Sequence, residues 1–159
     1  MNFLWFINHR NSTLPEREVL VDDPQYNAIR YSRGYKWQLR ESWSVDTGIV
    51  VAEEINTPFM HLDVTGILTF SKGFSWDASG PTFDTKDTLR ASLTHDGLYQ
   101  LFQGGHLDPD VYRIVADQLL LSILKQDGVP WLRRRIWYKA VRIAGGGSAR
   151  KPKKILTAP

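Results

Sequence analysis

Cysteine is absent from the 159-residue sequence. Disulfide bonds and thiolate metal sites are therefore excluded, while the compartment is left open. Long hydrophobic runs are also missing: the apolar start at residues 1–7 is broken by Asn8, His9 and Arg10 and has no basic lead. This start is too short for a signal peptide or a membrane span, so we expect a cytosolic beginning and no transmembrane segment.

Acidic residues are missing from the last part of the chain. Val129 to Pro159 contains nine Lys or Arg and no Asp or Glu, and since the whole chain carries +3, the rest carries about −6. A basic end on an acidic body favours phosphate-rich partners, whether nucleic acid, anionic lipid or an acidic protein surface. Nucleic acid is the weaker candidate, because no recognisable nucleic-acid motif is present. A solvated tail is the alternative to a partner site at Arg133, Arg134, Arg135, Lys151, Lys153 and Lys154.

The residues that are present suffice for one folded domain. Hydrophobic residues make up 42% and charged residues 23% of the chain, as in globular proteins. We predict an α+β fold in which an N-terminal antiparallel β-sheet packs with a C-terminal unit of two or three helices. The β-rich part covers about 16–72 and the mainly helical part 84–144. We expect the domain to span 1–147, with a hinge at Gly145–Gly147 and a flexible basic tail at 148–159.

Alternation of apolar and polar residues supports the predicted sheet. From Ala28 to Ile49, large apolar side chains occupy odd positions, which is typical of half-buried antiparallel strands. Breaks are expected near residues 33–34 and 40–41. The other strand candidates are 18–21, 50–54, 60–65 and 67–71.

Caps and apolar periodicity predict the helices. Asp84 or Thr85 is a suitable N-cap for the first, and Asp108 followed by Pro109 starts the second. Residues 140–144 either continue the third helix or form a terminal strand. The helices are predicted over Leu89–Phe102, Pro109–Gln126 and Trp131 to about Lys139.

Two polar residues fall on apolar helix faces. His95 lies in line with Tyr99 on the first helix, and Asp117 lies on the apolar face of the second. A buried carboxylate requires a partner, and two antiparallel helices joined by a short turn could bring Asp117 to His95. A histidine held by a buried aspartate, with a tyrosine hydroxyl nearby, suits general-base chemistry. A structural pair that locks the helix hairpin is the alternative.

The stretch from Gly73 to about Gly145 resembles a family of uncharacterised bacteriophage proteins. The likeness rests on a core of the form Gly-Phe-x-Trp-Asp…Ala-Ser-Gly-Pro followed by Arg-Ala-Ser-Leu-x-His-Asp-x-Leu-Tyr, although this chain lacks one Gly between Asp77 and Ala78. The resemblance implies a viral protein of the host cytoplasm or the virion. The matched residues include Trp76, Asp77, Ser79, Pro81, Asp84, His95, Asp96 and Tyr99.

His-Asp-x-x-Tyr on one helix and Ala-Asp on the next are also similar to phospholipase A2, in particular its short viral-capsid form. This resemblance implies that His95 activates water, that Asp117 orients His95, and that Tyr99 bonds to Asp117. It also implies a Ca²⁺ held by Asp96 with oxygens from the loop at Asp77 and Gly80, since calcium takes six to eight oxygen ligands. The usual Gly-x-Gly calcium loop is absent. The remaining loop residues, in supporting roles, are Trp76, Ser79, Pro81 and Asp84.

The sequence thus supports two hypotheses of different classes. One is a phage-encoded, phospholipase A2-like hydrolase of lipid or envelope esters that uses the His95–Asp117 pair, with Ca²⁺ as a candidate cofactor. The other is a non-enzymatic virion, tail-associated or assembly protein in which the same pair is structural.

Overall fold

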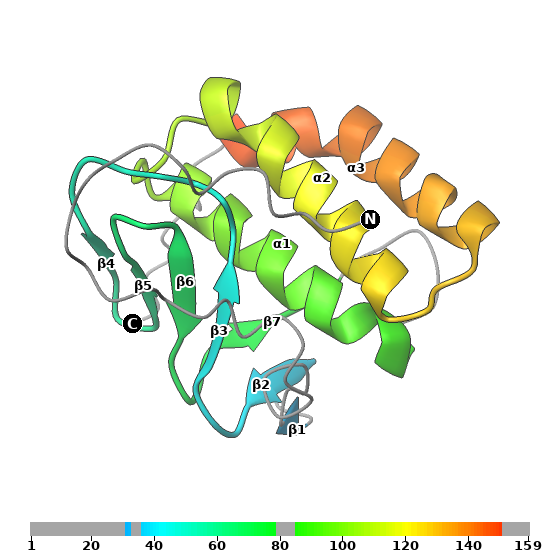
Figure 1. The fold of residues 1–159 in the computed structure, drawn as a ribbon, viewed down its shortest axis with the longest axis horizontal. Coiled ribbons are helices and arrows are strands. Elements are labelled where there is room, and N and C mark those ends of the chain that lie inside the picture. The colour runs from blue at the N-terminus through cyan, green and yellow to red at the C-terminus, as the bar shows by residue number, and fades with distance from the viewer. Residues whose placement is uncertain (1–30, 33–35, 79–84, 151–159) are drawn as a thin grey trace, which may run out of the picture.

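A computed structural model describes residues 31–32, 36–78 and 85–150 of the chain. The strand predicted at 18–21 lies outside the described residues. The described part combines two antiparallel sheets with three C-terminal helices, which confirms the predicted α+β class (Figure 1).

The sheets are small and antiparallel throughout. One has the strand order β1-β2-β7 and the other the order β3-β6-β5-β4. In the second sheet Trp43 pairs with Phe70 and Val45 with Leu68, so the large apolar side chains share one face. The strands are β1 (Tyr31–Ser32), β2 (Trp37–Leu39), β3 (Trp43–Asp46), β4 (Ile55–Asn56), β5 (Met60–Leu62), β6 (Ile67–Phe70) and β7 (Ser75–Trp76).

The strand predicted at 50–54 and the loop predicted at Trp76 were both wrong. Residues 50–54 form no strand, and the pairing begins instead at Ile55, which lies opposite Leu62. Ala52, Glu53 and Glu54 are exposed, and none of them is a residue type favoured in strands. Conversely, β7 lies within the stretch predicted as a loop, because Trp76 is buried opposite Trp37.

The starts of the first two helices agree with the predicted capping chemistry to within a turn. The Asp108 carboxylate accepts a bond of 2.8 Å from the backbone N–H of Asp110, ahead of α2. The first helix is preceded by a short 3₁₀ turn rather than beginning directly after Thr85. The elements are η1 (Lys86–Thr88), α1 (Leu89–Gln103), α2 (Pro109–Gln126) and α3 (Trp131–Arg150).

The predicted hinge at Gly145–Gly147 was wrong, because α3 continues through all three glycines to Arg150. Tertiary contacts compensate for the low helix propensity of glycine. Arg113 of α2 donates hydrogen bonds to the backbone carbonyls of Val141 and Arg142, at 3.0 Å and 2.6 Å. Of the predicted tail, residues 148–150 are therefore helical, and 151–159 lie outside the described residues.

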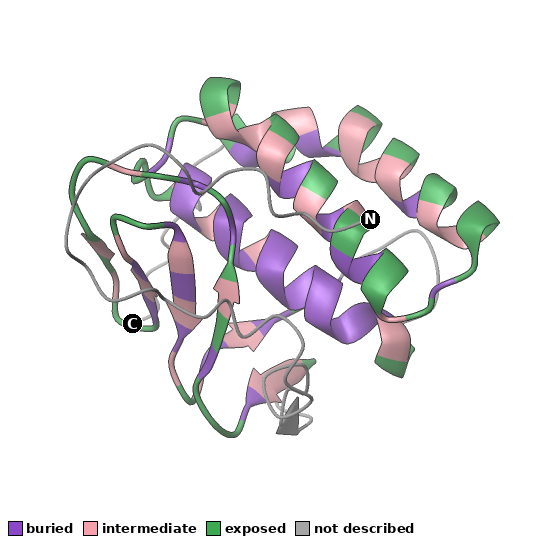
Figure 2. Ribbon diagram, in the orientation of Figure 1, coloured by how far each residue is buried: buried purple, intermediate pink, exposed green. Residues whose placement is uncertain are grey.

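Helix α1 is the centre of the fold. It is buried along almost its whole length, with the sheets and the other two helices packed around it (Figure 2). At Gly97 an added Cβ would lie 2.3 Å from the ring of Phe70, so glycine permits the close approach of α1 to β6. The central position of α1 places His95 and Tyr99 between the sheet layer and the outer helices.

Candidate functional site

The structure brings His95 and Asp117 together. The Nε2 atom of His95 lies 2.9 Å from Oδ1 of Asp117, and the hydroxyl of Tyr99 donates to the same oxygen at 3.0 Å. Asp117 is fully buried, while His95 is 8% exposed. The Nδ1 atom of His95 has no hydrogen-bond partner among the described residues. Because Nε2 faces a carboxylate, we assign its proton to Nε2, which leaves Nδ1 as a proton acceptor.

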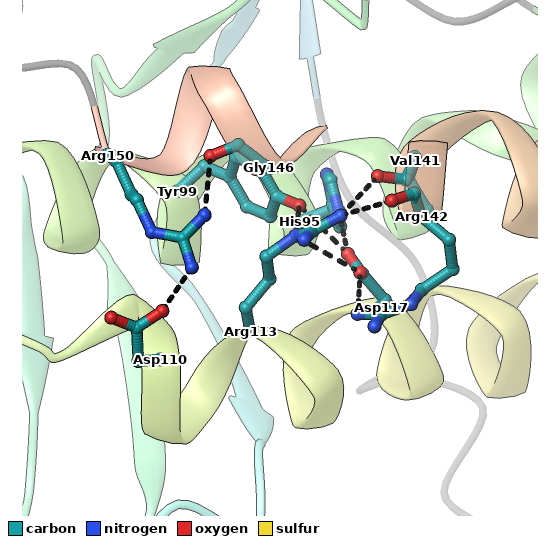
Figure 3. Close-up of polar contacts among 9 residues, drawn as sticks. All are labelled: His95, Tyr99, Asp110, Arg113, Asp117, Val141, Arg142, Gly146 and Arg150. Carbon is teal, nitrogen blue, oxygen red and sulfur yellow. Dashed lines mark hydrogen bonds and ion pairs between the residues drawn. The ribbon is translucent and has the colours of Figure 1, made fainter. Parts of the chain in front are cut away.

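Two arginines that the sequence analysis did not assign to the site complete the environment of Asp117 (Figure 3). Arg142 of α3 donates from Nη1 to Oδ2 at 2.8 Å, and the Nε atom of Arg113 lies 3.6 Å from the same oxygen. Arg113 also donates to the Tyr99 hydroxyl at 3.2 Å. Arg113 stands four residues before Asp117, so helical spacing could have identified it, whereas no sequence signal connects Arg142 to α2.

The charge state of the cluster follows from these contacts. Burial by itself would raise the pKa of Asp117, but hydrogen bonds from His95 and Arg142 outweigh it and hold the pKa below the usual range. Burial raises the pKa of Tyr99 to about 12, so its hydroxyl stays protonated near neutral pH. The site therefore contains an ionised Asp117, a neutral Tyr99 and two guanidinium groups.

Glycine at position 145 allows α3 to approach the cluster closely. A Cβ built there would lie 2.3 Å from the Tyr99 hydroxyl oxygen, which Asp117 and Arg113 already hold. At Gly147, two residues further along α3, an added Cβ would have no neighbouring atom within 4 Å. Position 145 therefore has no room for a side chain, whereas position 147 does, although both lie in α3.

We expect Gly145→Ala to destabilise the fold by about 1–3 kcal/mol, because overpacking must displace either α3 or Tyr99. Gly147→Ala is the matched control and should stabilise the fold by up to about 1 kcal/mol through helix propensity. Urea denaturation of the two variants measures both effects. Equal stabilisation by both substitutions would contradict the close packing of α3 on Tyr99.

A pocket of about 710 Å³ opens beside the pair. It is lined by His95, Asp96 and Tyr99 from α1, by Trp76 from β7 and by Trp137 from α3. The indole N–H of Trp76 donates to the Ser92 hydroxyl at 3.1 Å, which fixes one side of the pocket. The pocket has room for a small or medium-sized organic ligand next to the imidazole.

The acidic residues predicted for the metal site have different surroundings. Asp96 lines the pocket, and its Oδ2 accepts a bond of 3.1 Å from the backbone N–H of Ala78, a residue with a positive φ of 49°. Burial raises the pKa of Asp96, although His95 and the loop N–H groups oppose this effect. Asp77 is exposed, with Lys36 3.9 Å away. Ser79, Gly80, Pro81 and Asp84 lie outside the described residues.

The described residues do not by themselves make up a calcium site. Among residues 36–78 and 85–150, no three His, Asp or Glu side chains are grouped so that they could hold a metal ion. One oxygen of Asp96 is already bonded to the loop backbone, and Ca²⁺ takes six to eight oxygens.

The three arginines of the predicted basic site contact other residues of the fold. Arg133 donates to the Thr85 hydroxyl at 2.7 Å and lies 3.5 Å from Asp87. Arg134 donates to the carbonyl of Val129 at 3.0 Å, and the Arg135 guanidinium lies 5.0 Å above the ring of Trp131. Lys151, Lys153 and Lys154 lie outside the described residues.

The fold and the site define an α+β protein with a buried His–Asp–Tyr cluster beside a pocket. Comparison of the chain with protein-family models, curated proteins and solved structures gave no match. None of the helices in the described ranges is both long and apolar enough to cross a lipid bilayer.

Proposed function

We propose that the chain is a phospholipase A2-like hydrolase of lipid or envelope esters, encoded by a bacteriophage, in which His95 is the general base. The observation that carries the proposal is the hydrogen bond of 2.9 Å between His95 Nε2 and Asp117 at the edge of a pocket. This bond leaves Nδ1 free to accept a proton. The pocket is lined by both polar and apolar side chains, which suits an ester with a hydrophobic chain.

In the proposed mechanism a water molecule lies beside Nδ1 of His95. The imidazole removes a proton as the water oxygen attacks the ester carbonyl, and the ionised Asp117 stabilises the imidazolium that forms. Collapse of the tetrahedral intermediate breaks the ester C–O bond, and the proton on Nδ1 passes to the leaving alkoxide. Tyr99 and the two arginines hold Asp117 in place throughout.

The direct test measures fatty-acid release from phospholipid vesicles by the wild-type chain and by His95→Ala. The proposal requires release by the wild-type chain and only background release by the variant, because the variant lacks the proposed general base. Equal release by both proteins would contradict the proposal. Far-ultraviolet circular dichroism of each protein checks that both are folded.

Calcium activation is part of the proposal. Asp96, a carboxylate that lines the pocket, would bind Ca²⁺, with further oxygens from Asp77 and Gly80, and the bound ion would polarise the ester carbonyl. We expect Ca²⁺ to raise the thermal midpoint of the wild-type chain and to leave that of Asp96→Asn unchanged. Without Ca²⁺, Asp96→Asn should be at least as stable as wild type at neutral pH, because it removes a carboxylate whose pKa burial raises.

Differential scanning fluorimetry with and without Ca²⁺ checks this prediction. The matched control is Glu53→Gln, which removes an exposed acid of the sheet layer and should respond to Ca²⁺ like wild type. An equal Ca²⁺ response in Asp96→Asn would place the ion elsewhere.

One observation favours a second candidate function. In addition to His95, Arg142 and Arg113 contact Asp117. The two arginines also join α3 to the hairpin formed by α1 and α2. Such a network would also serve a virion or assembly protein in which the His–Asp pair only stabilises the fold. In that case the chain should occur at fixed stoichiometry in purified particles and should release no fatty acid.

A further inference from the structure

The outward side of α3 combines exposed apolar and basic residues. We call this surface the α3 outer face and define it by Leu132, Arg135, Ile136, Lys139 and Ile143, which repeat at helical spacing. Leu132 is 62% exposed, Ile136 45% and Ile143 84%. Exposed residues recur along α3 in Figure 2. Three large aliphatic side chains in line on one exposed helix face indicate an interaction surface rather than a solvated one.

The charges of α3 separate into two groups. Arg133, Arg142 and Arg150 are paired with acids of the fold, namely Asp87, Asp117 and Asp110. Arg135 and Lys139 lie on the outer face and have no acidic partner among the described residues. No Asp or Glu occurs anywhere in α3. The outer face is therefore positively charged as well as apolar.

The chain beyond α3 continues the same composition. Residues 151–156 read Lys-Pro-Lys-Lys-Ile-Leu, with three further cations, two aliphatic residues and no acid. The Trp131 side chain at the start of α3 is 60% exposed and lies under the Arg135 guanidinium. Tryptophan, aliphatic residues and cations on one helix are the combination that binds at the headgroup level of a bilayer.

The outer face also borders the pocket. Ala140 and Ala144 line the pocket, and they stand four and eight residues after Ile136, on the adjoining side of the helix. Ala144 is itself exposed. A surface bound at the outer face would therefore lie next to the opening of the pocket.

We propose that the α3 outer face binds the surface of an anionic lipid bilayer. Its apolar side chains enter the headgroup region, and Arg135 and Lys139 pair with lipid phosphates. A nucleic acid would use the cations but would gain little from Leu132, Ile136 and Ile143, whereas a bilayer uses both. The surface acts without hydrolysis, so this inference and the proposed hydrolase can fail separately.

Vesicle flotation tests the inference with the full chain. We expect wild type to float with phosphatidylglycerol-rich vesicles and much less with pure phosphatidylcholine. Arg135→Gln with Lys139→Gln should weaken partitioning roughly 25-fold, at about fivefold for each cation removed. Changing Leu132, Ile136 and Ile143 together to Ser should weaken it by at least about tenfold.

Matched variants separate this surface from the rest of the molecule. Lys72→Gln and Val50→Ser change an exposed cation and an exposed apolar residue of the sheet layer, and both should float like wild type. His95→Ala should also float like wild type even if it hydrolyses nothing, which distinguishes binding from catalysis. Urea denaturation confirms that each variant is folded.

Four results would overturn the proposal. Wild type could fail to float with anionic vesicles, or the outer-face variants could float as well as wild type. The chain could bind a DNA duplex, and only the variant changed at Arg135 and Lys139 could lose that binding. This result would assign the face to nucleic acid. Light scattering could instead show a dimer that dissociates in the Leu132, Ile136 and Ile143 variant, which would assign it to a second copy.

Discussion

Replacing Asp117 with alanine is expected to lower the free energy of unfolding by about 3–5 kcal/mol, the cost of breaking a buried ion pair by removing one partner. The carboxylate is fully buried and accepts bonds from His95, Tyr99 and Arg142. Without it, a guanidinium that is only partly exposed and two polar groups lose their shared acceptor. Urea denaturation at neutral pH measures the loss.

The matched control is Asp110→Ala on the same helix. Asp110 also pairs with an arginine, Arg150, but its side chain is 67% exposed, so the change should cost at most about 1 kcal/mol. An equal cost for both substitutions would show that burial does not strengthen the Asp117 network.

The effect of Asp117→Ala should depend on pH. Because the folded protein holds the pKa of Asp117 below its ordinary value, the carboxylate contributes stability above the unfolded pKa of about 3.9. This contribution is lost as the pH falls through the lower folded pKa. The difference in stability between wild type and Asp117→Ala should therefore be full at neutral pH and shrink at strongly acidic pH.

Asp117→Asn is expected to reduce ester hydrolysis by about 10⁴-fold, as the loss of the orienting aspartate does in a catalytic triad. The amide keeps the shape of the carboxylate but carries no charge, so it cannot stabilise an imidazolium. If its NH₂ group faces Nε2 of His95, the ring proton moves to Nδ1 and the base is lost. The rate per folded molecule, measured on phospholipid vesicles, checks this prediction.

Asp127→Asn provides a control for loss of a structural ion pair. Asp127 lies just beyond the end of α2 and pairs with Arg90 at 2.7 Å, away from the pocket. The substitution removes the charge of the Asp127 carboxylate and should leave hydrolysis per folded molecule unchanged. If both asparagine variants keep wild-type hydrolysis, the His95–Asp117 pair is structural and the non-enzymatic candidate is favoured.

Local chemistry made much of the helical layer predictable. Asp108 and Pro109 mark the start of α2, and the apolar spacing around His95 and Asp117 places both residues on inward faces. A buried aspartate needs a partner, and His95 was the obvious polar group on the facing helix. The contact between His95 and Asp117 could therefore be predicted from the sequence alone.

The strands were harder to predict. Alternation indicated the segments that form β3, β5 and β6, but it also suggested a strand at 50–54 and did not reveal β7. Strand pairing depends on partners distant in the chain: Trp76 becomes part of a strand because Trp37 lies opposite it. Residues near in sequence carry little information about such pairing.

The sequence by itself determined the first two helices, the third as far as about Lys139, the cap of α2, and the inward positions of His95, Tyr99 and Asp117, because these depend on spacing within a few turns of chain. Only the tertiary structure decided that Arg142 would reach Asp117 and that Gly145 would lie against Tyr99. Those contacts require α3 to cross α1 and α2 at close range, and helix-to-helix approach is set by the packing of whole side-chain surfaces. The same packing keeps three consecutive glycines helical, where local propensity favours a hinge.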